Sequence, residues 1–129
     1  MKRSIYFFVI VIAMLSGCKG KPGGGQSTPE EAAGMVFAAA KSGNFGPLKD
    51  LCDPSLDADT DSKKICEVPT GDDELKSRFK EYFAKGKVVG TAKIEGDRAK
   101  VDVLIGNDGT KEGTFNMAKK DGKWYLVSF

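Results

Sequence analysis

The three cysteines are the residues of this chain whose chemistry is easiest to infer from their surroundings. Cys18 ends the box Leu15-Ser16-Gly17-Cys18, which follows a basic start and an unbroken apolar run over residues 5–15. A basic start, an apolar run and small residues before a cleavage point are typical of a secretory signal. The run is too short to span a bilayer. We therefore expect residues 1–17 to be a signal peptide.

The box around Cys18 resembles the lipobox of bacterial lipoproteins. The resemblance implies that the Cys18 thiol is diacylated and the preceding peptide is then removed, so that a lipid anchor fixes the chain to a membrane of the bacterial cell envelope. In enterobacteria an aspartate after the lipidated cysteine favours the inner membrane, and here that position is Lys19. We expect the periplasmic face of the outer membrane if the host is Gram-negative. We expect no cofactor besides the covalent lipid on Cys18.

The other two cysteines, Cys52 and Cys66, enclose thirteen residues. If Cys18 carries lipid, these two are left as a matched pair in an oxidising compartment, where disulfides persist. Redox-active cysteines are typically two residues apart, and this spacing is much longer. We expect a structural disulfide that stabilises the fold by about 3 kcal/mol.

Alternating carboxylates at Asp57, Asp59 and Asp61 match the first three ligand positions of a calcium loop. The remainder departs from the motif, because Ser62 stands where the turn requires glycine and Val68 where the bidentate acid belongs. A noncanonical calcium site and a solvated acidic loop are both open, and the acidic loop is the more usual outcome for such a segment.

Charge argues against nucleic acid as a partner. The chain has twenty basic and eighteen acidic residues, and removal of the signal peptide takes away Lys2 and Arg3 and leaves a neutral mature protein. Binding to a phosphate backbone depends on excess positive charge. Residues 18–27 are Gly-rich and polar and are expected to be a flexible tether. Residues 28–129 then suffice for a single domain.

Helix signals fill the first half of this domain. Thr28 and Glu31 form a capping box with Pro29 at the first helical position, which predicts a helix from Pro29 to its stop at Gly43. A short helix should follow, with a loop from Asp53. Apolar residues at helical spacing then predict an amphipathic helix from the Thr70–Asp73 region to Gly86.

Period-two alternation fills the second half and predicts four antiparallel strands. A two-residue turn at Gly96-Asp97 would pair Ile94 with Ala99 and Val88 with Ile105. A three-residue loop at 107–109 would pair Val101 with Phe115, and a turn at Asp121-Gly122 would pair Met117 with Leu126.

These registers divide the sheet residues between two faces. The face toward the helices is expected to be free of carboxylates and to comprise Val88, Gly90, Ala92, Ile94, Ala99, Val101, Val103, Ile105, Gly113, Phe115, Met117, Trp124 and Leu126. The outer face should carry the apolar stripe Tyr125, Val127 and Phe129. Such a stripe is expected to mark an interface with a second copy or an envelope protein partner, or to be covered by the chain's own segment 53–69.

Four stretches resemble small bacterial lipoproteins of the nuclear transport factor 2-like, or cystatin-like, superfamily, in an uncharacterised group of exported domains. They are TPEEAA from Thr28, GNFGPLKDLC from Gly43, EGDRAKVDV from Glu95 and KKDGKWYLVSF from Lys119. The resemblance implies an α+β fold in which N-terminal helices pack on a curved four-stranded antiparallel sheet and form a cone. It implies little about function, because one fold hosts many activities.

Enzymes of this superfamily work from acids, tyrosines or histidines that project into the cone. This chain has no histidine, and the register places Asp102 on the outer face. Tyr82 and Trp124 have the spacing of core residues. We therefore expect no enzymatic activity.

The leading hypothesis is a membrane-anchored, non-enzymatic domain that binds a protein partner or a small ligand in the envelope. The alternative is a carrier of a lipid or similar small molecule, because Gly90, Ala92, Ala99 and Gly113 leave room beneath the helices. Filling of that space by Phe37, Phe79 and Phe83 would count against the carrier.

Overall fold

The computed structural model describes residues 25–129. The predicted signal peptide, Cys18 and most of the predicted tether lie outside the described residues. The fold is α+β, as predicted. Its elements are α2 (Pro29–Ser42), η2 (Gly46–Asp50), α3 (Thr60–Glu67), η3 (Val68–Thr70), α4 (Asp73–Phe83), β1 (Lys87–Val88), β2 (Lys93–Glu95), β3 (Arg98–Ile105), β4 (Lys111–Lys120) and β5 (Lys123–Ser128). None of the helices within residues 25–129 has the length and hydrophobicity that a membrane crossing requires.

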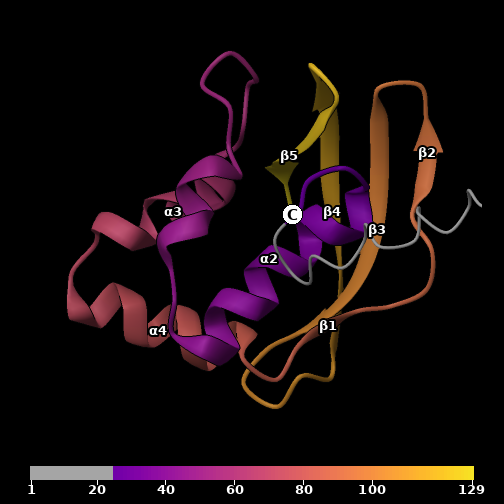
Figure 1. Ribbon diagram of the computed structural model, residues 1–129. Coiled ribbons are helices and arrows are strands. Elements are labelled where there is room, and N and C mark those ends of the chain that lie inside the picture. Colours follow the sequence, from indigo (N-terminus) through magenta and orange to yellow (C-terminus); the bar gives the residue numbers. More distant parts are fainter. Residues whose placement is uncertain (1–24) are drawn as a thin grey trace, which may run out of the picture.

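Helix α2 begins and ends where its sequence signals predict. The Thr28 hydroxyl oxygen accepts the N–H of Glu31 at 3.1 Å, and Gly43 takes the left-handed conformation at φ 81°. The helix contacts α4 on one side and β1, β3 and β5 on the other. It is therefore the central element between the α3–α4 pair and the sheet (Figure 1).

The sheet is antiparallel and has the order β1-β3-β4-β5, with β2 also paired to β3. Three predicted registers are confirmed, because Ile94 pairs with Ala99, Val101 with Phe115, and Met117 with Leu126. The Asp121-Gly122 turn has positive φ at both residues, the geometry that matches the right-handed twist of the two strands. Turn chemistry in the sequence thus specified most of the sheet.

The first predicted strand is wrong in its middle. Val88 pairs with Val103 and not with Ile105, so residues 89–92 contain extra chain that leaves the ladder and splits the strand into β1 and β2. One cause is visible in α2, where a Glu30 carboxylate oxygen accepts the Ala92 N–H at 2.9 Å. Ile94 follows this break and is 54% exposed, although the alternation placed it in the core.

Helix α3 was not predicted, since its residues were assigned to a loop. The Asp59 carboxylate accepts the N–H of Ser62 at 2.8 Å and caps the helix, and Ile65 and Val68 are buried beneath it. The sequence does contain a helix signal here, an Asp cap followed by apolar residues three apart. It is weak because charged residues outnumber apolar ones in this segment. Packing of a narrow apolar stripe decided the conformation.

Phenylalanine side chains fill the space between helices and sheet. Phe37 of α2 stacks on Phe115 of β4 with ring centroids 5.8 Å apart. Phe83 lies edge-on to Phe37 at 6.1 Å, and Phe79 lies 5.0 Å from Phe83. This packing occupies the room that the small residues of the sheet were expected to leave and counts against the carrier hypothesis.

Candidate functional site

A β-bulge divides the predicted outer stripe. Met117 pairs with Leu126, but the next ladder pair is Asn116 with Ser128, so Val127 is an extra residue in β5. The shift reverses the facing of every later side chain. Phe129 therefore lies on the helix side, with its ring 5.4 Å from that of Phe115 and 6.0 Å from that of Phe83. The prediction that Tyr125, Val127 and Phe129 share one outer face is therefore wrong.

Other segments of the chain form backbone hydrogen bonds with the edge of β5 that faces away from β4. The carbonyl of Gln26 accepts the Trp124 N–H at 2.9 Å, and that of Leu51 accepts the Leu126 N–H at 2.9 Å. The Val127 carbonyl accepts the Asp59 N–H at 2.8 Å. Gln26 was assigned to the tether, Leu51 to a short helix and Asp59 to a loop. Their hydrogen bonds with β5 satisfy the backbone of an edge strand, which removes a template for pairing with other chains.

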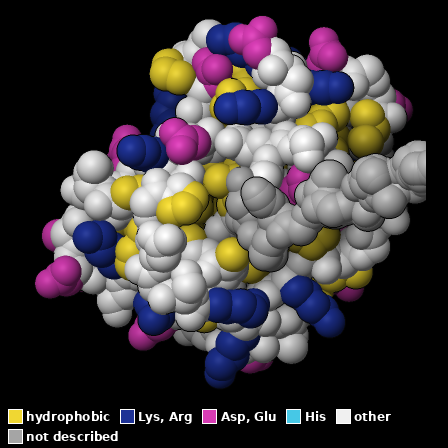
Figure 2. Space-filling view, in the orientation of Figure 1, with side chains coloured by type: hydrophobic (Ala, Val, Ile, Leu, Met, Phe, Trp, Pro, Cys, Tyr) yellow, Lys and Arg dark blue, Asp and Glu magenta, His cyan; other side chains and the backbone are white. Residues whose placement is uncertain are grey.

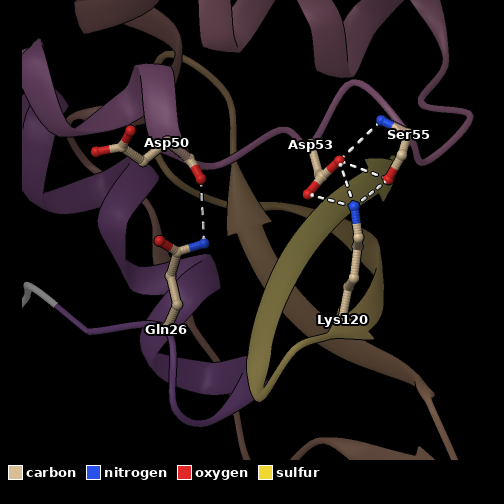
Figure 3. Close-up of polar contacts among 5 residues, drawn as sticks. All are labelled: Gln26, Asp50, Asp53, Ser55 and Lys120. Carbon is tan, nitrogen blue, oxygen red and sulfur yellow. Dashed lines mark hydrogen bonds and ion pairs between the residues drawn. The ribbon is translucent and has the colours of Figure 1, made fainter.

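Two polar clusters hold these segments in place (Figure 3). The Gln26 side-chain amide donates to the backbone carbonyls of Trp124 at 2.9 Å and of Asp50 at 3.2 Å. Lys120 donates to both carboxylate oxygens of Asp53 at 3.2 Å. The hydroxyl and backbone N–H of Ser55, followed by Lys120, hold the pKa of Asp53 below its ordinary value. Within residues 25–129, contacts with the rest of the domain therefore already include Gln26, just before the predicted boundary.

The predicted disulfide between Cys52 and Cys66 is confirmed. It joins the end of the η2 region to α3. The disulfide therefore attaches α3, the helix that was not predicted from the sequence, to the rest of the domain.

The acidic residues Asp57, Asp59 and Asp61 do not form the calcium loop that was considered. Asp59 uses its carboxylate as the cap of α3. Within residues 25–129, no three acidic, cysteine or histidine side chains gather as a metal site. Asp57 and Asp61 are exposed to solvent.

The side chains weighed for catalysis lie in separate places. Asp102 is exposed on the outer face, as predicted, where the Thr114 hydroxyl donates to its carboxylate at 3.3 Å. The Tyr82 hydroxyl accepts a hydrogen bond from the Lys111 ammonium at 3.3 Å. Trp124 is buried, with the Lys119 ammonium 5.9 Å from its ring centroid. Each of these groups has a local partner that accounts for its position.

The geometry instead brings apolar side chains together in a groove between α3, α4 and the end of the sheet. The groove has a volume of about 180 Å³ and is lined by Ile65, Val68, Leu75, Phe79, Tyr82, Phe83 and Phe129, with Asp61, Lys64 and Arg78 at its rim. We call this set of residues the apolar groove. Hydrophobic side chains reach the surface over the α3–α4 part of the molecule, among charged ones (Figure 2).

Sequence reasoning found only part of this groove. The spacing of Leu75, Phe79 and Tyr82 predicted the α4 wall. The α3 wall was missed with its helix, and the bulge that turns Phe129 inward has no signal in the alternation pattern. The groove is therefore a product of tertiary packing.

Residues 22–127 match the family model described as a domain of unknown function, DUF4878. The chain belongs to this family. The match includes every residue of the apolar groove except Phe129. A comparison with curated proteins finds no match.

Solved structures with similar folds come from several bacteria. A SEC-C motif containing protein from Rhodopseudomonas palustris is 20% identical, with a TM-score of 0.51 over 80% of this chain and 77% of that one. A proposed NTF2-like transpeptidase from Campylobacter jejuni is 23% identical, with a TM-score of 0.49 over 78% and 97%. An NTF2-like protein of unknown function from Shewanella baltica is 16% identical, with a TM-score of 0.47 over 76% and 84%. At this level of identity the first likeness concerns the fold alone.

Proposed function

We propose that this member of the DUF4878 family is a membrane-anchored, non-enzymatic domain that binds a protein partner in the bacterial cell envelope through the apolar groove. The observation that carries the proposal is the groove itself, an apolar depression with charges of both signs at its rim. Apolar surface that remains partly open costs free energy in water, and a partner side chain that covers it recovers that cost.

The size of the groove favours a protein segment over a free small molecule. Pockets that hold drug-sized ligands usually measure about 300–1,000 Å³, and the groove is smaller at about 180 Å³. One or two apolar side chains fit such a volume. A segment with an aromatic or aliphatic anchor would insert it between Leu75 and Phe129.

The rim supplies the means to orient that segment. Lys64 on α3 and Arg78 on α4 are exposed, and Arg78 forms an ion pair with Glu74 at 2.7 Å. Exposed pairs of this kind contribute little to stability, so their exchange for a partner's carboxylate costs little. An acidic residue beside the apolar anchor would fit this rim.

Anchoring through Cys18 completes the proposal. The sequence around Cys18 supports a covalent lipid, and Lys19 supports the periplasmic face of the outer membrane. Gln26, hydrogen bonded to β5, would be the point where the tether joins the domain. A short tether keeps the domain at a high local concentration near partners of the same membrane.

Site-specific photocrosslinking in cells tests the binding proposal. A photoreactive amino acid at Leu75, on the groove wall, should give a defined crosslinked product. The same residue placed at Ile94, which is exposed on β2 far from the groove, is the matched control and should give none. Equal products at both positions, or none at Leu75, would refute the groove as the binding site.

A further inference from the structure

A second hollow opens on the outer face of the sheet, where β2, β3 and β4 lie side by side. It has a volume of about 460 Å³ and is lined by Lys93, Glu95, Arg98, Ala99, Lys100, Asn116 and Met117. We call it the basic hollow. It is separate from the apolar groove, because its residues come from strands and those of the groove come mainly from α3 and α4.

Three cationic side chains and one carboxylate line the basic hollow. Lys93 lies directly opposite Lys100 in the β2–β3 ladder, and like charges in this position destabilise a sheet. Glu95 lies directly opposite Arg98. In the part of the chain that the structure describes, the ion pairs are Arg78–Glu74 and Lys120–Asp53, so none of the three cations is paired there.

Protection of a sheet edge explains only one of these charges. Edge strands often carry lysine, which discourages pairing with other chains, and Lys93 lies on the edge strand β2. Arg98 and Lys100 lie on β3, which is covered by neighbours on both sides. Edge protection therefore does not explain why these two cations lie beside Lys93 along the β2–β3 ladder.

The rim of the hollow is also held in place. The Asn116 amide donates to the Ser128 hydroxyl at 2.8 Å, on the strand pair that the bulge brings into this register. The β4 wall is thus fixed while the cationic side chains stay exposed to solvent. A fixed wall beside unpaired cations suits an anionic ligand that enters from solution.

We propose that the basic hollow binds a phosphoryl group. The Arg98 guanidinium supplies a planar fork of donors that matches phosphate oxygens, and the two lysines supply point charges on either side. A bound phosphoryl group converts the repulsion between Lys93 and Lys100 into two attractions. A soluble phosphorylated molecule and a phospholipid headgroup share this chemistry.

Calorimetric titration of the full chain with inorganic pyrophosphate tests the site. We expect measurable binding, weakened about tenfold in Lys93→Gln and in Lys100→Gln, since tenfold corresponds to the loss of one charged contact. Lys87→Gln is the matched control, because Lys87 is an exposed lysine of β1 on the same sheet face but outside the hollow. Its affinity for pyrophosphate should equal that of the wild type.

Thermal unfolding separates loss of the site from loss of the fold. Without pyrophosphate, Lys100→Gln should melt at or above the wild-type temperature, because the like-charge pair is gone. With pyrophosphate, the wild type should gain stability and Lys100→Gln should not.

Vesicles identify the source of the phosphoryl group. The full chain with Cys18→Ser is sedimented with phosphatidylglycerol vesicles and with phosphatidylcholine vesicles. A lipid headgroup is supported if the protein prefers phosphatidylglycerol vesicles and if Lys93→Gln and Lys100→Gln reduce this binding. A soluble ligand is supported if the protein binds pyrophosphate but neither kind of vesicle. Absence of binding in both experiments, or wild-type binding by both variants, would overturn the proposal.

Discussion

Phe129 is the residue on which the groove depends. The bulge at Val127 turns its ring toward Phe83 and Phe115, so it closes the sheet side of the core and lines the apolar groove at once. A single extra residue in β5 therefore changes an outer side chain into a core contact, because side chains alternate with a period of two.

Substitution of Phe129 by alanine should measure this contact. We expect a loss of about 2–3 kcal/mol in the free energy of unfolding, somewhat below a fully buried phenylalanine because the ring is half-buried. Urea unfolding gives the value. Ile94→Ala, at an exposed apolar residue, is the control, and an equal loss in both variants would show that Phe129 is not a core residue.

Asp53 makes stability depend on acid pH. Its folded-state pKa is lowered, so its hydrogen bonds stabilise the fold above the ordinary aspartate pKa of about 4, and this contribution is lost as the pH falls through the lower folded-state value. Asp53→Asn should therefore unfold at lower urea than the wild type at pH 7, and the difference should disappear in acid. Asp57→Asn, which removes an exposed carboxylate from the same loop, is the control for loss of a charge at pH 7.

At the scale of elements, α3 is the part of the fold most dependent on its attachments. It has eight residues, a length at which an isolated helix is marginal in water. The disulfide at Cys66, the cap at Asp59 and the hydrogen bond from Asp59 to Val127 hold it against η2 and β5. Because α3 forms one wall of the groove, these attachments also maintain the proposed binding surface.

Replacement of Cys52 and Cys66 together by alanine should loosen this wall. We expect a loss of about 3 kcal/mol from the closed loop, and a fall in crosslinking at Leu75. Urea unfolding of the non-reduced protein provides the first measurement. Two free thiols in the mass spectrum of the non-reduced wild type would contradict the bond.

On the scale of the whole molecule, the domain has two proposed binding surfaces and one proposed point of attachment. The apolar groove is formed mainly by helices, and the basic hollow by strands, so a partner and a phosphoryl group could be bound together. Gln26 is fixed on β5, and the predicted tether therefore joins the domain at a defined position.

Cys18→Ser should release the protein from the membrane. In fractionated cells we expect the wild type in the membrane fraction, with incorporated labelled palmitate, and the variant in the soluble fraction. Cys52→Ala/Cys66→Ala keeps the predicted lipidation site and should stay in the membrane fraction. Absence of labelled palmitate from the wild type, or equal labelling of Cys18→Ser, would contradict a lipid anchor.

The sequence by itself determined the α+β class, the limits of α2, three strand registers and the disulfide pair. Those features rest on local chemistry, such as the cap at Thr28, the glycine at Gly43 and the turn at Asp121, or on the cysteine count. Tertiary structure alone decided the break after Val88, helix α3 and the facing of Phe129. Each of these depends on a contact between segments far apart in sequence, such as Glu30 with Ala92 or Asp59 with Val127, and local patterns carry no information about such contacts.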